Sequence, residues 1–222
     1  MDKKRVKKII CLHGYAMNRA WIAAWLNLIQ QRLGDHYQLL YPQGPITCPA
    51  DEVRAMTARF NALLPEERIG KGKNWCWYRA DEQQPPHYQQ IETALAYLSD
   101  YFVQHGPVDG LIGWSQGAVM TAILSALKQT EAGNHFDFNW AILCGGFLPG
   151  DRRYRPLFDQ PLKLPTLHVS GTQESDFMKK QADKMAAAFN SAERLNTPCG
   201  HMMPVKHPAY LDKIADWIIN RP

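Results

Sequence analysis

The chain has 222 residues, of which 45% are hydrophobic and 21% charged, and its formal net charge is +4. These values are ordinary for a globular protein and exclude the disordered and membrane-embedded classes. Apart from a lysine-rich stretch at residues 3–8, typical of the solvated edge of a first strand, the basic residues are dispersed, so we expect no nucleic-acid partner.

No stretch approaches the roughly 18 consecutive apolar residues that cross a bilayer, and the N-terminus has no apolar signal core. We therefore expect a cytoplasmic protein without stable membrane association. The five cysteines favour the same compartment, since Cys11 and Cys144 lie in apolar runs while Cys48, Cys76 and Cys199 are isolated. Their spacing suggests neither a disulfide framework nor a metal site.

Short apolar runs alternate along the chain with helix-like segments. The strands are expected at Val6–Leu12, at Tyr37–Tyr41, in the run that begins at Val108, and at Trp140–Cys144, Leu164–Ser170 and Glu193–Asn196. The helices are expected between Asn18 and Gly34, at Ala50–Leu64, from Pro85-Pro86 to Phe102, from Ala118 to Leu124, from Phe177 to Phe189 and at Pro208–Ile219. This alternation predicts one α/β domain over 1–222, with a mostly parallel, doubly wound sheet of about six strands covered by helices on both faces.

The segment 46–80 interrupts the alternation between the second strand and the helix before the third. It contains a connection rich in polar residues (Pro65–Asn74) and then the aromatic cluster Trp75-Cys76-Trp77-Tyr78. Two interpretations stay open. The insertion covers a pocket at the carboxyl edge of the sheet, or its tryptophans cap the hydrophobic core beneath a long loop.

The most informative motif is Gly113-Trp114-Ser115-Gln116-Gly117, which joins the strand beginning at Val108 to an apolar helix. A strand, a sharp turn with serine at its apex and a helix are the context of a nucleophile elbow. Glycines flank the serine because the strained turn brings neighbouring backbone too close for side chains. The pattern predicts Ser115 as a nucleophile.

Further polar residues stand where the later strands end. Glu174 and Asp176 follow the fifth strand, and His201 follows the sixth in a glycine-containing turn. Ser, acid and His in this chain order are what a hydrolase triad on this fold requires. His201 is therefore the expected base, and the residues leave both carboxylates open as its partner.

The other expected parts of the site surround this triad. The main-chain N–H groups of Tyr15 and Gln116 are expected to form the oxyanion hole, since they follow the first strand and the nucleophile. Small-molecule pockets are mostly apolar, so the substrate pocket is expected to use aromatic side chains near strand ends. These are Trp75, Trp77, Trp114 and Phe147.

Several of these stretches together resemble the FSH family of serine hydrolases. They are Ile9–Gly14, Gly113–Ala118, Gly145–Phe147, Leu167–Gly171 and Gly200–Pro204. The resemblance implies a compact α/β-hydrolase fold without a large cap domain, a small-molecule acyl ester as substrate, and no cofactor or metal. The family usually has aspartate three residues after the glycine matching Gly171, where this chain has Glu174, and that position favours Glu174 over Asp176.

Three functions follow as hypotheses. The first is a carboxylesterase that works through an acyl-serine intermediate. The same chemistry also allows an acyl-protein or acyl-CoA thioesterase, and a glutamate at the acid position leaves a catalytically silent binding protein as a third hypothesis. Acyl length, the alcohol or thiol portion and oligomeric state are not specified by the sequence.

Overall fold

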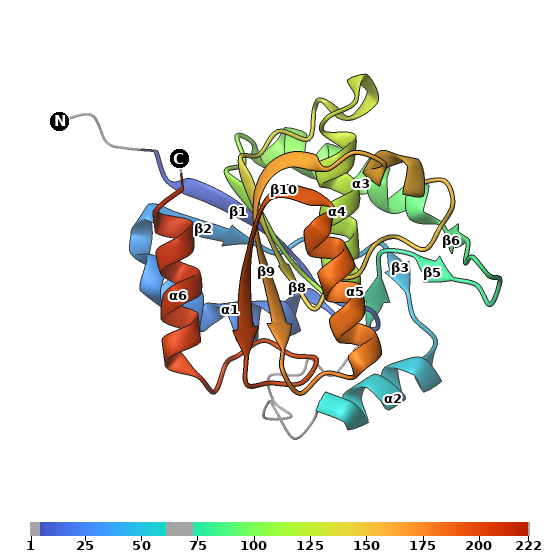
Figure 1. Ribbon diagram of the computed structural model, residues 1–222, viewed down its shortest axis with the longest axis horizontal. Helices are drawn as coiled ribbons and strands as arrows, with labels where there is room; N and C mark the ends of the chain where they lie inside the picture. Colours follow the sequence, from blue (N-terminus) through green and yellow to red (C-terminus); the bar gives the residue numbers. More distant parts are fainter. Residues whose placement is uncertain (1–4, 61–72, 222) are drawn as a thin grey trace.

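The computed structural model describes residues 5–60 and 73–221 (Figure 1). Its main sheet has six strands in the order β10-β9-β8-β7-β1-β2, and every neighbouring pair is parallel. The strands are β1 (Lys7–Leu12), β2 (Tyr37–Leu40), β7 (Gly110–Trp114), β8 (Trp140–Cys144), β9 (Leu162–Gly171) and β10 (Phe189–Thr197). The predicted six-stranded α/β-hydrolase sheet is confirmed.

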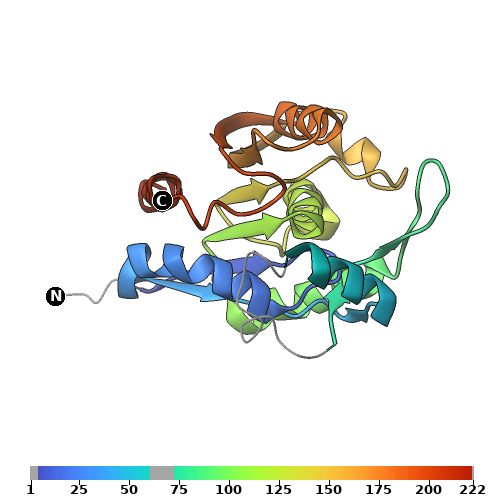
Figure 2. The same cartoon turned by 90° about the horizontal axis from the view of Figure 1, so that it is seen from below.

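Helices cover both faces of this sheet, as Figure 2 shows from the edge. The α-helices are α1 (Arg19–Leu33), α2 (Ala50–Phe60), α3 (Ile91–His105), α4 (Gln116–Leu127), α5 (Asp176–Ala187) and α6 (Pro208–Ile219). The short 3-10 helices are η1 (Gly34–His36), η2 (Glu131–Gly133) and η3 (Arg155–Phe158). Helices α1 and α6 share one hydrophobic cluster, whereas α3, α4 and the end of α5 share the other. None of the helices in the described ranges has the length and apolarity to span a membrane.

Strand β1 begins with two partly buried lysines, and its last four residues show why the buried part of a central strand is apolar throughout. Ile9 and Cys11 belong to the cluster under α1 and α6, while Ile10 and Leu12 belong to the cluster under α3 and α4. Successive side chains of a strand point to opposite faces, so a strand covered on both sides has no polar position. These two layers hold the ends of β1, β7 and β9 in fixed positions.

Two helix boundaries differ from the sequence prediction. Phe189 begins β10 instead of ending the helix before it, and α5 stops at Ala187. Strand β10 lies at the sheet edge with only its two end residues buried, so its sequence carries little hydrophobic signal. Pro85-Pro86 does not open α3, which begins only at Ile91.

The insertion 46–80 contains short strands and one helix, and its last strand pairs with a strand just beyond residue 80. Strand β3 (Ile46–Thr47) pairs antiparallel with β4 (Trp75–Cys76), and β5 (Arg79–Ala80) pairs antiparallel with β6 (Tyr88–Gln89). Between β3 and β4 runs α2, which ends at Phe60. The rest of the helix expected to reach Leu64 and most of the polar connection lie outside the described residues.

Candidate active site

Ser115 occupies the turn between β7 and α4 in a strained backbone conformation. Its φ is 53° and its ψ is −116°, in a region that L-residues rarely adopt. The Ser115 N–H donates to the Cys144 carbonyl at 2.8 Å, which ties the turn to the next strand. Strain of this kind persists only where the surroundings enforce it, and it is concentrated at functional sites.

The two glycines of the motif are required by close backbone contacts. A Cβ on Gly113 would lie 2.3 Å from the Gly117 carbonyl oxygen. A Cβ on Gly117 would lie 2.2 Å from the Leu12 carbonyl oxygen, at the end of β1. Because neither contact leaves room for a methyl group, a side chain at either position would force the backbone of the turn to move.

His201 lies directly beside the serine. Its Nε2 is 3.0 Å from Ser115 Oγ, a hydrogen-bond distance. The ring packs 5.2 Å from that of Trp114, centroid to centroid, and a Cβ on Gly145 would lie 2.7 Å from His201 Cε1. The imidazole therefore packs between Trp114 and Gly145, which hold it next to the nucleophile.

Glu174 lies on the other side of the imidazole. Its Oε2 is 3.4 Å from His201 Nδ1, longer than an ordinary hydrogen bond, and its Oε1 accepts from the Gly171 N–H at 3.3 Å. Catalytic hydrogen bonds are often long without substrate. Burial by itself raises the pKa of this carboxyl, but the His201 ring and the Gly171 N–H outweigh it, so the pKa of Glu174 lies below its ordinary value.

The structure places Asp176 elsewhere. This residue is the first of α5, its side chain is 92% exposed, and its carboxylate lies 3.5 Å from Lys179 Nζ. The cap of the helix is Ser175, whose hydroxyl accepts from the Met178 N–H at 3.3 Å. Of the two candidate carboxylates, only Glu174 therefore contacts the histidine.

Two main-chain N–H groups belong to segments that adjoin the nucleophile turn. Gln116 follows Ser115 as the first residue of α4, and Tyr15 follows the end of β1, which pairs with β7. Within the described ranges, neither N–H donates a hydrogen bond to another protein group. They are the groups that the sequence indicates for an oxyanion hole.

The Gln116 side chain has a second role that the sequence did not reveal. Its Oε1 accepts from the Trp77 N–H at 2.9 Å, and its Nε2 donates to the Tyr78 carbonyl at 2.7 Å. The amide thus holds an extended stretch of the insertion against the elbow. A glutamine beside a serine nucleophile was the available signal, since a buried amide needs several partners.

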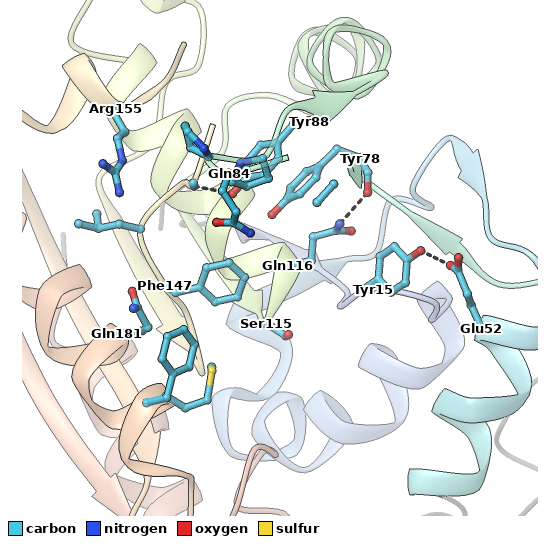
Figure 3. A pocket seen from close by; sticks show the side chains of 17 residues that line it. Tyr15, Glu52, Tyr78, Gln84, Tyr88, Ser115, Gln116, Phe147, Arg155 and Gln181 are labelled. Atoms are coloured by element: carbon cyan, nitrogen blue, oxygen red, sulfur yellow. Dashed lines mark hydrogen bonds between the residues drawn. The ribbon is translucent and has the colours of Figure 1, made fainter. Parts of the chain in front are cut away.

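A cavity of about 810 Å³ opens beside Ser115 (Figure 3). Most of its wall is aromatic or aliphatic, and several polar side chains complete it. The apolar lining residues include Tyr78, Pro85, Pro86, Tyr88, Phe147, Leu148, Phe177 and Met178. The polar ones include Tyr15, Glu52, Gln84, Arg155 and Gln181. A small-molecule site is expected to have this composition.

The tryptophans expected in the pocket do not line this cavity. Trp77 is fully buried and donates from its indole Nε1 to the His13 carbonyl at 2.8 Å. Trp114 is buried under the imidazole, and Trp75 pairs its backbone with Met17. Of the four predicted pocket residues only Phe147 lines the cavity, and the indoles of Trp77 and Trp114 fill the core instead.

Most of the cavity lining comes from residues that the sequence motifs do not indicate as pocket residues. Tyr78 and Tyr88 stack with ring centroids 3.9 Å apart and form one wall. Phe177 is 68% exposed at the start of α5, and the sequence pattern indicates it only as part of a helix. The one sequence signal for a pocket rim was the large apolar side chain of Phe177 directly after the polar residues Glu174, Ser175 and Asp176.

One protein-family model matches residues 1–212, which is almost the whole sequence of 222 residues. Its description is serine hydrolase (FSH1). The chain belongs to the FSH1 serine hydrolase family. The resemblance seen in the motifs is thereby confirmed.

Several known proteins are similar in sequence to nearly the whole of this chain. Esterase OVCA2 of Xenopus tropicalis is 27% identical over 93% of this chain and 90% of its own length. The human esterase OVCA2 is 26% identical over 97% of this chain and 100% of its own. An uncharacterized hydrolase of Schizosaccharomyces pombe is 29% identical over 98% of this chain, which spans about half (52%) of that protein.

Several solved structures share the fold of this protein at low sequence identity. A Zea mays acyl-protein thioesterase 2 superposes with a TM-score of 0.67 at 16% identity, over 98% of this chain and 94% of that one. Esterase PE8 superposes with a TM-score of 0.64 at 16% identity, over 97% and 92%. These likenesses establish the α/β-hydrolase fold.

Proposed function

We propose that this protein is a serine esterase that cleaves carboxylic esters through an acyl-serine intermediate. The observation that carries the proposal is the 3.0 Å contact between His201 Nε2 and Ser115 Oγ at the apex of a strained turn. A serine hydroxyl becomes a competent nucleophile when a neighbouring imidazole accepts its proton. Membership of the serine hydrolase family supports the same chemistry.

The acylation step follows from the positions of these groups. His201 Nε2 takes the proton from Ser115 Oγ as the oxygen bonds to the ester carbonyl carbon. The carbonyl oxygen becomes an oxyanion, which accepts hydrogen bonds from the N–H groups of Tyr15 and Gln116. His201 then gives its proton to the departing alkoxide, and the acyl group remains on Ser115.

Deacylation repeats the sequence with water. His201 Nε2 removes a proton from the water as its oxygen attacks the acyl carbon, and the proton returns to Ser115 Oγ when the acid leaves. Glu174 holds the Nδ1–H tautomer and stabilises the imidazolium in both steps. Its buried position and its lowered pKa support a charged carboxylate in this role.

The proposed substrate has an apolar acyl or alcohol portion. The aromatic and aliphatic wall around Phe147, Tyr78 and Tyr88 favours groups larger than acetyl. Thioesters undergo the same acyl transfer at the same triad. The preference between esters and thioesters therefore depends on the cavity, and kinetic measurements determine it.

Two experiments test the proposal. A fluorophosphonate probe should label the wild-type protein and leave Ser115→Ala unlabelled, whereas a catalytically silent fold would leave both unlabelled. A panel of p-nitrophenyl esters of increasing acyl length, with one acyl-CoA, should show ester turnover that Ser115→Ala reduces by roughly a million-fold. Ser115→Ala with a tenth of wild-type activity would contradict the nucleophile, and turnover of the acyl-CoA alone would make the protein a thioesterase.

A further inference from the structure

Cys48 and Cys76, far apart in the sequence, lie side by side in the insertion. The β3–β4 ladder pairs Ile46 with Cys76, and the Cys48 N–H extends it by donating to the Asn74 carbonyl at 2.9 Å. Because strand side chains alternate, Cys48 and Cys76 project from the same side of this ribbon as diagonal neighbours. The two thiols are close enough for each to change the pKa of the other.

The two thiols have opposite surroundings. Cys48 is half-buried, and the pKa of its thiol is lowered by the interaction with Cys76, aided by the Ala16 N–H and the Arg79 charge. Burial and the Glu52 carboxylate act in the opposite direction. Cys76 is fully buried, and the pKa of its thiol is raised because its proton is held by Cys48 and because burial disfavours its charge. A partly exposed thiol with a lowered pKa thus adjoins a buried thiol with a raised pKa, the arrangement of an attacking and a resolving thiol.

We propose that Cys48 and Cys76 form a reversible disulfide when the protein meets a peroxide. The Cys48 thiolate attacks one oxygen of hydrogen peroxide, breaks the O–O bond and becomes a sulfenic acid, while hydroxide leaves and takes up a proton. The Cys76 sulfur then attacks the Cys48 sulfur, loses its proton and releases the sulfenic oxygen as water. Overall, two thiols and one peroxide give one disulfide and two waters.

The dithiol is physically linked to the loop that carries Tyr15. The Ala16 N–H, one residue further on, donates to the Cys48 sulfur, and Ala16 has a positive φ of 52°. Beside Cys76, Trp75 exchanges two backbone hydrogen bonds with Met17, at 2.7 and 3.2 Å. Drawing the Cys48 sulfur toward Cys76 takes the acceptor away from Ala16, so oxidation should shift the Tyr15 N–H and slow ester cleavage.

Peptide mass spectrometry tests the disulfide itself, independently of the proposed function. After brief treatment with hydrogen peroxide, the wild-type protein should lose two thiols and yield a peptide pair joined through Cys48 and Cys76, which dithiothreitol separates. Cys199→Ser should behave in the same way, since Cys199 takes no part. Cys76→Ser should stop at a Cys48 sulfenic acid that dimedone traps, and Cys48→Ser should form no crosslink.

The activity measurement rests on the proposed function and is therefore kept separate. Oxidised wild-type protein should lose at least about threefold in kcat/KM toward an ester and recover it with dithiothreitol, while Cys48→Ser should be unaffected by the same brief treatment. A crosslink through Cys199, or peroxide-treated protein that keeps both thiols, would overturn the proposal. A Cys48–Cys76 crosslink with unchanged kcat/KM would overturn its link to the oxyanion loop, whereas an enzyme inactive before oxidation would contradict the proposed function instead.

Discussion

Glu174 and Asp176 stand two positions apart in the sequence, yet their surroundings assign them to different tasks. Glu174 is 7% exposed and lies 3.4 Å from the histidine, whereas the Asp176 side chain is 92% exposed in the first turn of α5. A buried carboxylate beside an imidazole orients it, while an exposed one at a helix N-terminus stabilises the helix. Burial therefore separates two residues that the sequence left as alternatives.

Glu174→Gln should lower kcat by up to about ten-thousand-fold, because the amide cannot stabilise the imidazolium or enforce its tautomer. Asp176→Asn is the matched control and should keep kcat within about twofold, since it loses only a surface ion pair with Lys179 and an interaction with the helix dipole of about 0.3 to 1 kcal/mol. Steady-state kinetics of both variants on one ester decide the matter. A large loss in Asp176→Asn beside a near-normal Glu174→Gln would reverse the assignment.

At the scale of elements, the packing of α4 against the end of β1 holds the nucleophile in place. Gly117→Ala would put a methyl group 2.2 Å from the Leu12 carbonyl oxygen and 2.7 Å from that of His13. The backbone must move, at a cost of about 1 to 3 kcal/mol, and it carries the Tyr15 N–H with it. We expect a Tm lower by about 2 to 12 °C and a kcat lower by at least about tenfold.

Gly200→Ala provides the control for this prediction. It lies next to His201, but the nearest atom to its added Cβ is the Gln173 carbonyl oxygen at 4.0 Å. This is an ordinary contact, so the variant should keep the wild-type Tm and most of kcat. Equal losses in the two alanine variants, seen by thermal unfolding and ester kinetics, would show that close backbone approach is not the reason for Gly117.

The turn after β8 is tied to β6 by a buried carboxylate. Asp151 accepts from the N–H groups of Tyr88 at 2.7 Å and Arg153 at 2.9 Å and from the Arg153 guanidinium, while His87 Nδ1 lies 3.5 Å away. Burial would raise the pKa of Asp151, but these donors lower it far below the ordinary value. Asp151 thus helps to hold the Tyr88 wall of the cavity.

Asp151→Asn should lower the Tm at pH 7 by about 3 to 12 °C, because hydrogen bonds to a charged group contribute about 1.5 to 3 kcal/mol. A carboxyl with a lowered folded-state pKa stabilises the protein above its unfolded pKa, near 3.9, and this contribution is lost on further acidification. The Tm difference between wild type and variant should therefore shrink below about pH 4. Asp159→Asn, an exposed control, should match wild type, and a Tm difference independent of pH would contradict the charged state of Asp151.

At the scale of the whole molecule, the cavity is assembled from segments that are distant in the chain. Residues after β1, from α2, around β5 and β6, after β8 and from α5 all contribute to its wall. Phe147 is central to this wall, since it also borders a second cavity, of about 440 Å³, beside Glu174 and His201. Substrate preference should depend on this residue more than on the tryptophans.

Phe147→Ala should lower kcat/KM for a hexanoate ester by about 10- to 200-fold, the scale set by losing apolar contact with a few methylene groups. The acetate ester is the internal control and should change by less than about threefold, because its acyl group does not reach far along the wall. Kinetics of both esters with wild type and variant measure the difference. A uniform loss for both esters would indicate a disturbed triad instead of a changed pocket.

The elements and the nucleophile followed from the sequence because their signals are local. Runs such as Trp140–Cys144 are apolar throughout since both faces of the sheet are covered, and the glycines around Ser115 mark a turn that no other residue allows. His201 was also accessible, as chain order and strand ends limit the choice. The sixth strand, expected at Glu193–Asn196, is confirmed as β10, but its start at Phe189 was missed because an exposed edge strand has no hydrophobic pattern.

Tertiary structure alone decided the remaining parts of the site. Glu174 and Asp176 are both acids after one strand, and only the three-dimensional path of the turn buries one against His201 and leaves the other in water. The tryptophans satisfy the composition of a pocket, but packing places Trp77 and Trp114 in the core and leaves the wall to Tyr78 and Tyr88. Contacts between segments distant in the chain depend on how these segments pack together, and no local pattern records that packing.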